Sequence, residues 1–203
     1  MMKSNKELLR EYIEHISKMQ VVHASELPSI QLYMDQVTTF MNERLEAHKR
    51  YDDDKIMTKT MINNYAKNDL LPSPEKKKYS KDHMILLLFI YYFKNILSIT
   101  DIQSLLTPIT DEYFQAKEGM DLTELYESIT TLRSSANREM LEDLVRQMDR
   151  SSSLFPDEEN REELQRFAFI CMISYDVYMK KMLLERMIDE IRAEETDTGK
   201  KKK

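Results

Sequence analysis

The chain has 203 residues, 41% of them hydrophobic, and a formal net charge of -6, which allows one large domain or two small ones with buried cores. Only 2 glycines and 5 prolines are present, which excludes a fold rich in β-hairpins and predicts an all-α, or nearly all-α, protein. The single cysteine, Cys171, excludes an intrachain disulfide and a zinc site built from cysteines.

The apolar runs of the chain are short. The longest, "MILLLFIYYF" from Met84 to Phe93, falls well below the roughly 18 residues that a membrane-spanning helix needs. The N-terminal "MMKSNKELLREYIEH" is charged throughout and has no apolar signal core. We therefore expect a cytoplasmic protein with no membrane partner, in which the apolar run forms a buried helix.

Helical periodicity dominates the first third of the chain. Residues 3–20 predict an amphipathic helix with Ser4 as its cap and Glu7 three positions later. A second helix is predicted from about residue 29 to Lys49, and the acidic "YDDDK" closes it. A third, shorter helix is predicted over residues 58–68, with Thr58 or its neighbour as cap.

Two further helices follow a proline-rich break. Pro72 and Pro74 end the third helix, because proline lacks an amide donor and restricts the preceding residue. Ser80 begins a fourth helix that runs to about Leu97. "SITDIQSLL" supplies a fifth helix capped by Thr100, and "TPIT" is expected to end it.

The remainder of the chain predicts two long helices. Apolar residues recur every three or four positions from Leu122 to Met148, and again on a broader surface over residues 160–194. The apolar neighbours of Cys171 favour a buried, inert thiol over a redox sensor. The domains expected are an N-terminal helix that serves as a brace or a dimer arm (1–26), a head (27–107), a helical region for dimerisation or effector binding (108–195) and a disordered basic tail (196–203).

Positive charge is concentrated in one part of this acidic chain. From Lys55 to Lys81 there are seven lysines and two acidic residues, a local net charge of +5 that leaves -11 for the remainder. This order of helix, tight loop and basic hairpin suits a helix-turn-helix with a wing, whose second helix would enter the major groove of DNA. A solvated lysine face is the alternative interpretation.

Two neighbouring asparagines are predicted to contact DNA bases. Amide side chains pair with adenine edges, so Asn63 and Asn64 are the candidate base readers. The residues expected to hold the DNA backbone, by charge or hydroxyl, are Lys59, Tyr65, Lys67, Lys76, Lys77, Lys78 and Tyr79.

The stretch "TKTMINNYAKNDLLPSPEKKKYSKDHMILLLFIYYFKNILSITDIQSLL" resembles the winged helix-turn-helix domain of the MerR family, with Asp69 to Pro72 on its Gly-Leu-Leu-Pro and Tyr79-Ser80 on its Tyr-Ser. From about Leu27 to Leu106 the chain is also similar to an uncharacterised bacterial family that carries such a head. The resemblance implies a homodimeric transcriptional regulator that binds a palindromic operator in double-stranded DNA. The resemblance does not indicate an effector ligand.

The chain departs from the MerR pattern at several positions. Asn63 replaces the family's arginine, and Asn64 replaces its first tyrosine. Asp69 replaces the turn glycine and is therefore expected to adopt a left-handed backbone. The wing lacks an Asn-Gly turn, which predicts a shorter or differently shaped hairpin.

No enzyme motif is present in the sequence. The four histidines are scattered, the "DDD" run lacks the glycine and glutamate of a calcium loop, and no glycine-rich phosphate loop or nucleophile elbow occurs. We expect no catalytic residue, no metal site and no cofactor. The alternative function is a protein-interaction module that uses the same helix-turn-helix scaffold to dock an acidic partner.

Overall fold

The computed structural model describes residues 3–19 and 21–201, apart from the side chains of 17, 18, 134, 135 and 195–201. The chain forms two compact units, each described by itself below. The head unit comprises residues 21–130 and 184–203, and the helical unit comprises residues 1–20 and 131–183. Over these described residues the fold is all-α apart from one two-stranded sheet.

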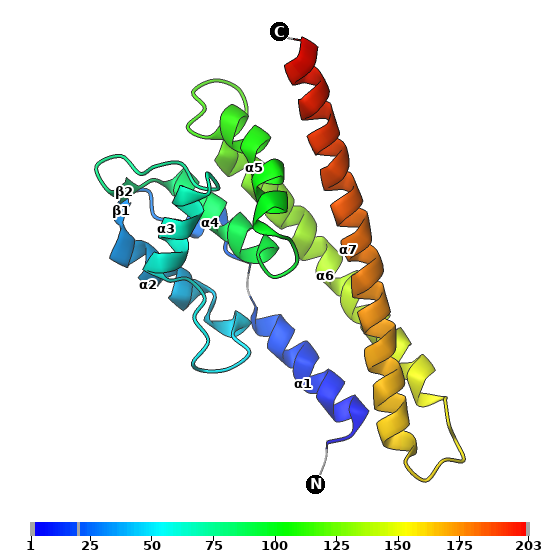
Figure 1. Cartoon of the computed structure of the whole chain (residues 1–203). Helices are drawn as coiled ribbons and strands as arrows, with labels where there is room; N and C mark the ends of the chain where they lie inside the picture. The colour runs from blue at the N-terminus through cyan, green and yellow to red at the C-terminus, as the bar shows by residue number, and fades with distance from the viewer. Residues whose placement is uncertain (1–2, 20, 202–203) are drawn as a thin grey trace. The chain divides into compact units, whose positions relative to one another are not determined.

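The head unit consists of short helices around one buried helix (Figure 1). Two single turns of 3-10 helix, Ala24–Glu26 and Glu46–His48, flank the first α-helix of this unit. Its main elements in chain order are β1 (Leu32–Tyr33), α2 (Met34–Arg44), α3 (Lys59–Lys67), β2 (Lys78–Tyr79), α4 (Lys81–Phe93) and α5 (Ile99–Tyr113).

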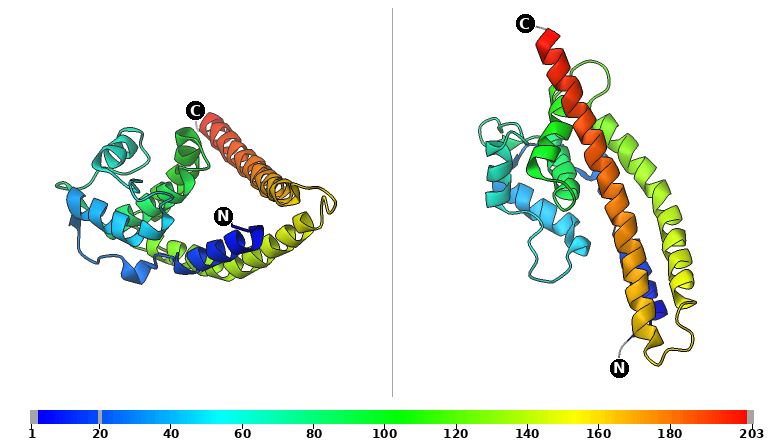
Figure 2. Two further views of the ribbon diagram at one scale, coloured as in Figure 1. Left: turned by 90° about the horizontal axis from the view of Figure 1, so that it is seen from below. Right: turned by 45° about the vertical axis from the view of Figure 1, so that its right-hand side comes forward.

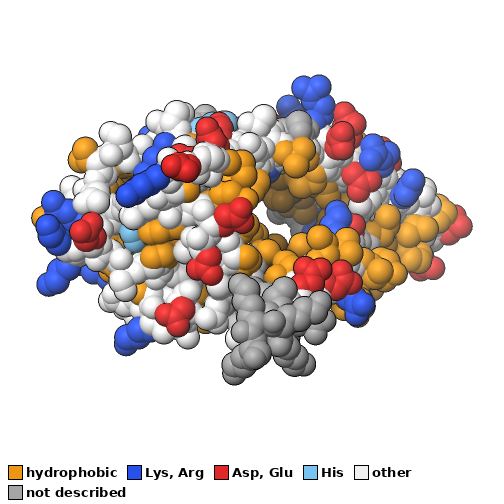
Figure 3. Space-filling model, turned by 90° about the horizontal axis from the view of Figure 1, so that it is seen from above, with side chains coloured by type: hydrophobic (Ala, Val, Ile, Leu, Met, Phe, Trp, Pro, Cys, Tyr) orange, Lys and Arg blue, Asp and Glu red, His pale blue; other side chains and the backbone are white. Residues whose placement is uncertain are grey.

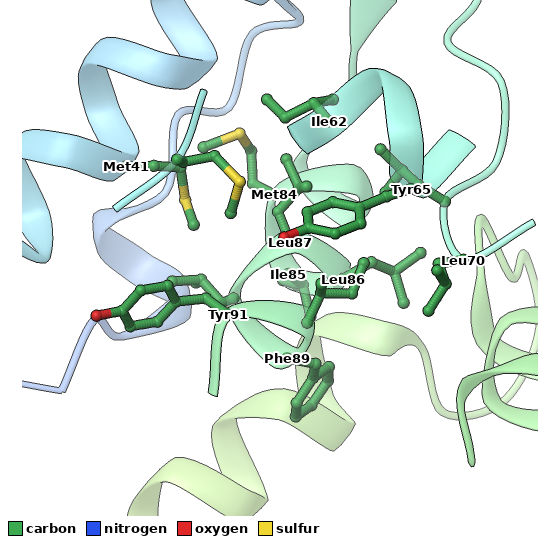
Figure 4. Close-up of a cluster of buried hydrophobic side chains, with 14 of the residues drawn as sticks. Met41, Ile62, Tyr65, Leu70, Met84, Ile85, Leu86, Leu87, Phe89 and Tyr91 are labelled. Atoms are coloured by element: carbon green, nitrogen blue, oxygen red, sulfur yellow. The ribbon is translucent and has the colours of Figure 1, made fainter. Parts of the chain in front are cut away.

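Helix α4 is the centre of the core of the head unit. Every residue from His83 to Tyr91 is buried, as expected for a helix that is apolar on all sides and surrounded by other elements. Met41 of α2 and Ile62 of α3 pack into the same cluster, which Figure 4 shows around Leu86 and Leu87. The buried helix predicted from the apolar run is therefore confirmed.

The predicted caps of α1, α3 and α4 agree with the structure, whereas α2 begins at Met34, about five residues later than predicted, and α5 has a different cap. Ser4, Thr58 and Ser80 each accept a hydrogen bond from a backbone amide in the first turn of their helix, as predicted. The cap of α5 is Ser98 instead of Thr100, because the Asp101 carboxylate accepts from the Ser98 amide at 3.1 Å and completes a capping box.

The predicted stop at "TPIT" is wrong. Helix α5 continues through Pro108 to Tyr113. Pro108 cannot donate to the Ser104 carbonyl four residues earlier, but the proline is exposed, and a helix tolerates a missing bond better on its solvent side than in the core. The helix ends at Phe114, whose amide donates to the Thr110 carbonyl.

The sheet joins two segments that are distant in sequence. β1 and β2 are antiparallel, with Leu32 opposite Tyr79 and Tyr33 opposite Lys78. β1 directly precedes α2, and β2 directly precedes α4. The basic loop before β2 is therefore attached to the start of α2, a pairing that the sequence pattern did not predict.

The helical unit is built from α1 (Asn5–Lys18) and parts of α6 (Leu122–Ser152) and α7 (Arg161–Lys201). α1 lies beside the C-terminal part of α6 in both views of Figure 2. The Asn5 side chain donates to the Glu162 carbonyl at 3.3 Å and accepts from Arg166 at 2.8 Å, which ties α1 to α7. Of the predicted disordered tail, residues 196–201 continue α7, and residues 202 and 203 lie outside the described residues.

Two further observations concern exposure and membranes. Cys171 is exposed, so the prediction of a buried thiol is wrong. Across residues 3–19 and 21–201, no helix combines the length and apolar character needed to cross a bilayer.

Candidate nucleic-acid interface

Helix α3 presents a polar face to solvent. The Thr58 hydroxyl accepts from the Met61 amide at 3.2 Å and fixes the start of the helix. Ile62 is fully buried against the core. The opposite side is exposed and carries only polar or charged residues, namely Lys59, Thr60, Asn63, Asn64 and Lys67.

The end of α3 is set by Asp69 in the left-handed conformation expected for it. Its φ is 53°. The Leu70 amide donates to the Tyr65 carbonyl at 2.9 Å, and the Asp69 amide donates to the Ala66 carbonyl at 3.4 Å. These are the two bonds of a Schellman motif, with the buried Leu70 and Tyr65 as its apolar contact. The motif fixes the direction in which the chain leaves α3.

The basic loop after α3 is a tight turn. The Lys78 amide donates to the Glu75 carbonyl at 2.9 Å. The two central residues, Lys76 and Lys77, have φ values of 50° and 63°, which is the φ pattern of a type I′ turn. Both lysines are exposed. This turn is the short wing that the sequence predicted without Asn-Gly.

Two of the candidate lysines already have partners in the head unit. Lys59 forms an ion pair with Asp35 in the first turn of α2. The Lys78 ammonium lies 5.5 Å from the centre of the Tyr33 ring, a cation–π distance. The Lys59–Asp35 pair is largely solvent-exposed, so it orients Lys59 more than it neutralises it.

Tyr65 and Tyr79 do not belong to an exposed contact surface. Their exposed fractions are 8% and 4%, and burial raises the pKa of both phenols. Figure 4 shows the Tyr65 ring directed toward Leu87 of α4. The prediction that these tyrosines contact phosphates is therefore corrected: each is an apolar anchor of an element that carries exposed lysines.

The connection between α2 and α3 is long but well anchored. The Asp54 carboxylate accepts from the Arg50 and Tyr51 amides, each at 3.0 Å. Further along, Ile56 and Met57 are buried, and the Lys94 ammonium donates to the Ile56 carbonyl at 2.9 Å. The Asn42 side chain of α2 also donates to the Met57 carbonyl at 2.8 Å, so the start of α3 is held against both α2 and α4.

The exposed predicted residues therefore come from two places in the head unit. Asn63, Asn64 and Lys67 lie on α3, and Lys76 and Lys77 lie at the wing tip. Figure 3 shows basic side chains at the left-hand edge, the side on which Figure 1 draws β1, β2 and α3. The described residues contain no cluster of three or more histidine, cysteine or acidic side chains that could hold a metal.

Sequence reasoning did not identify Tyr33 and Asp35 as partners of the lysines. Both lie on the segment that begins α2, and they meet Lys78 and Lys59 only because β1 pairs with β2 and α2 packs on α3. The acidic partner of Lys59 is thus 24 positions away in sequence.

The comparisons with known proteins identify one family. Residues 22–129 match the model of a family described as a domain of unknown function, DUF1836. The ends of this segment meet in the structure, since the buried Tyr126 hydroxyl donates to the Val22 carbonyl at 2.6 Å. No curated protein and no solved structure matches the chain. The match covers more than half of the 203 residues, so the chain belongs to the DUF1836 family.

Proposed function

We propose that this protein is a sequence-specific DNA-binding transcriptional regulator that acts as a homodimer on a palindromic operator. The observation that carries the proposal is the exposed polar face of α3, on which two adjacent asparagines are flanked by lysines. The resemblance of this segment to the MerR head adds support.

Recognition would depend on α3 lying in the major groove. Asn63 and Asn64 are exposed, and each amide offers the donor and acceptor that match the N6 and N7 positions of adenine. Lys67 follows one turn after Asn63 and Asn64 and would reach a phosphate. The buried Ile62 and Tyr65 hold the opposite side of α3 on the core and so fix the angle at which the asparagines are presented.

The wing would supply affinity that is independent of base sequence. Lys76 and Lys77 lie at the tip of a turn closed by a backbone hydrogen bond, and the cation–π contact holds Lys78 beside Tyr33. Lysines that neutralise phosphates release condensed counterions, so binding should weaken as salt concentration rises.

Dimerisation would use one face of α7. Five residues at steps of four, four, three and four form the α7 stripe and share one side of the helix: Phe167, Cys171, Tyr175, Tyr178 and Met182. All are exposed, Phe167 by 66% and Tyr175 by 65%. Contiguous exposed apolar surface of this kind marks an interaction site, and a second copy would place two α3 helices on successive turns of DNA.

The second candidate is a protein-interaction module. It is favoured by the ion pair between Lys59 and Asp35, which engages a predicted phosphate contact within the chain. In that case the wing lysines would dock an acidic protein surface.

Fluorescence-anisotropy titration distinguishes the two functions. The full-length protein is titrated against its own promoter fragment and a scrambled duplex at two salt concentrations. A regulator binds the promoter more tightly than the scrambled duplex, with a clear salt dependence. Weak and equal binding to both duplexes would overturn the regulator proposal in favour of the interaction module.

Two double variants locate the surface that binds. Lys76→Gln/Lys77→Gln should weaken binding to both duplexes and reduce the salt slope by about 2, since each phosphate contact contributes about 1. Lys180→Gln/Lys181→Gln removes the same charge from exposed positions of α7 and should leave the slope unchanged.

A further inference from the structure

A groove with apolar walls lies within the helical unit, between α1, α6 and α7. Its volume is about 370 Å³. Leu8 and Tyr12 line it from α1, Met148 from α6, and Phe169 and Ile173 from α7. The size falls in the range of small-molecule sites.

The groove is larger than the packing voids of a native core. It is open to solvent, because Leu8, Tyr12 and Ile170 on its walls are exposed, so an apolar occupant would remove apolar surface from water. Open contact surface also forfeits the dispersion energy that a close-packed neighbour would supply. An apolar occupant is therefore favoured on packing grounds.

A cationic side chain marks one part of this groove. Arg166 donates to Asn5 Oδ1 at 2.8 Å and to the Lys3 carbonyl at 2.5 Å. Both acceptors are neutral, and the structure pairs Arg166 with no carboxylate among residues 3–19 and 21–201. A guanidinium has five N–H donors, so donors remain for an anionic group.

We propose that this groove binds a small amphipathic carboxylate, with its apolar chain between α1 and α7 and its carboxylate on Arg166. Arginine holds carboxylates through paired, charge-assisted hydrogen bonds. The inference does not depend on DNA binding, because neither the groove nor Arg166 belongs to the head unit.

The groove and the α7 stripe lie on different sides of α7. At 100° per residue, Arg166, Phe169 and Ile173 are on one side, and Phe167 and Tyr178 are on another. A second copy seated on the stripe would therefore leave the groove free for a ligand.

The neighbouring groove on the other flank of α1 is a less suitable site. Lys6 and Arg10 line it together with Glu14 and Asp149, and this mixture of charges favours no single sign of ligand. Arg10 is also paired with Glu14 at 3.3 Å.

The test is isothermal titration calorimetry of the full chain at pH 7 with three probes of equal chain length: octanoate, 1-octanol and octylammonium. Octanoate should bind at one site per chain and at least about tenfold more tightly than 1-octanol, the usual scale of a charge-assisted hydrogen bond. Octylammonium should bind most weakly, because it brings a second cation to Arg166. Equal affinity for the three probes, or no saturable octanoate binding, would overturn the proposal.

Variants at position 166 test the carboxylate contact. Arg166→Met should lower octanoate affinity about tenfold and leave 1-octanol affinity unchanged, whereas Arg166→Lys should give an intermediate octanoate affinity. Arg186→Met removes a cation from an exposed site on the same helix and should have no effect. An equal loss for octanoate and 1-octanol in Arg166→Met would mean that the variant only disturbs packing, which would overturn the assigned contact.

Sedimentation velocity separates the ligand from a second copy of the chain. Ile170 also lines the groove, and Ile170→Trp should fill the space and abolish octanoate binding without changing the oligomeric state. If this variant dissociates a dimer and the wild-type chain does not bind octanoate, the groove is a self-association surface and the proposal fails.

Discussion

The Lys78 amide donates to the Glu75 carbonyl at 2.9 Å and closes a turn whose two central residues are both lysines with positive φ. A left-handed conformation costs a residue with a Cβ about 1–2 kcal/mol. The turn therefore keeps Lys76 and Lys77 in an unfavourable conformation where Asn-Gly would be relaxed. Strain of this kind is retained where side chains at the strained positions have a task.

Replacing the two strained lysines of the turn should change the stability of the fold and its affinity for DNA in opposite directions. Lys76→Asn/Lys77→Gly should raise the free energy of unfolding by about 1–2 kcal/mol, because both new residues accept positive φ. If the proposed phosphate contacts of the wing exist, the same variant should also weaken DNA binding, because both contacts would be lost. Urea denaturation and anisotropy titration measure the two effects. Lys76→Gln/Lys77→Gln, with equal charge loss and no relief of strain, should weaken binding without stabilising the fold.

Asp69 gives a second test of backbone strain, this time within the Schellman motif that ends α3. Asp69→Gly should raise the free energy of unfolding by about 1 kcal/mol, because glycine adopts φ near 53° at little cost. Asp69→Ala should lower it by a similar amount. Asp69→Asn is the charge control, since it removes a carboxylate from the negative end of the helix dipole and still tolerates the left-handed conformation. Equal stability of the glycine and alanine variants would contradict this account.

The sequence predicted the interior of the helices better than the contacts between them. The apolar run of α4 indicates burial on every side, and Asp69 at a turn-glycine position indicates positive φ; both are local properties. Whether a tyrosine is exposed, in contrast, cannot be predicted from its neighbours in the sequence. Tyr65 and Tyr79 stand beside lysines in sequence, but the helical period and the pairing of β1 with β2 turn both rings into the core.

Other differences have the same origin. Pro108 predicts a helix stop, yet its exposed position allows α5 to continue. Cys171 has apolar neighbours in sequence, but whether a helix face is covered depends on the number of partners packed against it, and here it is exposed. The Lys59–Asp35 ion pair depends on the packing of α2 on α3, which periodicity does not encode.

His83 should make the stability of the head unit depend on pH. Its Nδ1 accepts from the Ser80 amide at 3.0 Å, and burial lowers its pKa from 6.5 to about 4, opposed in part by the nearby backbone of Pro72 and Ser73. The folded state therefore favours the neutral ring. The stabilising contribution of neutral His83 to the free energy of unfolding is fully present above pH 6.5. It declines as pH falls toward 4, by about 2 kcal/mol between pH 7 and pH 5.

The measurement compares wild type with His83→Gln by urea denaturation from pH 7 to pH 4. Glutamine is accepted at this position of a capping box and does not titrate, so the difference in unfolding free energy between the two proteins isolates His83. That difference should shrink or change sign as pH falls. If the unfolding free energies of the two proteins instead change in parallel with pH, the protonation of His83 does not contribute to the loss of stability in acid.

The α7 stripe is the surface through which we expect the proposed homodimer to form. Phe167 and Tyr178 are eleven positions apart, which places them within about 20° on one side of the helix. Phe167→Glu/Tyr178→Glu should dissociate the dimer in sedimentation equilibrium, because four carboxylates would meet across a two-fold interface. Both side chains are exposed in the single chain, so its helical circular dichroism should be unchanged.

The matched control for the α7 stripe is Ser153→Glu/Asn160→Glu, which adds the same charge at exposed positions between α6 and α7 and should leave the dimer intact. DNA affinity should fall steeply in the stripe variant alone, because a monomer engages one half-site and loses the gain from linked binding. A stripe variant that remains dimeric would show that the dimer interface lies elsewhere on the chain. A wild-type chain that is monomeric at every concentration would leave the exposed α7 stripe to a different protein.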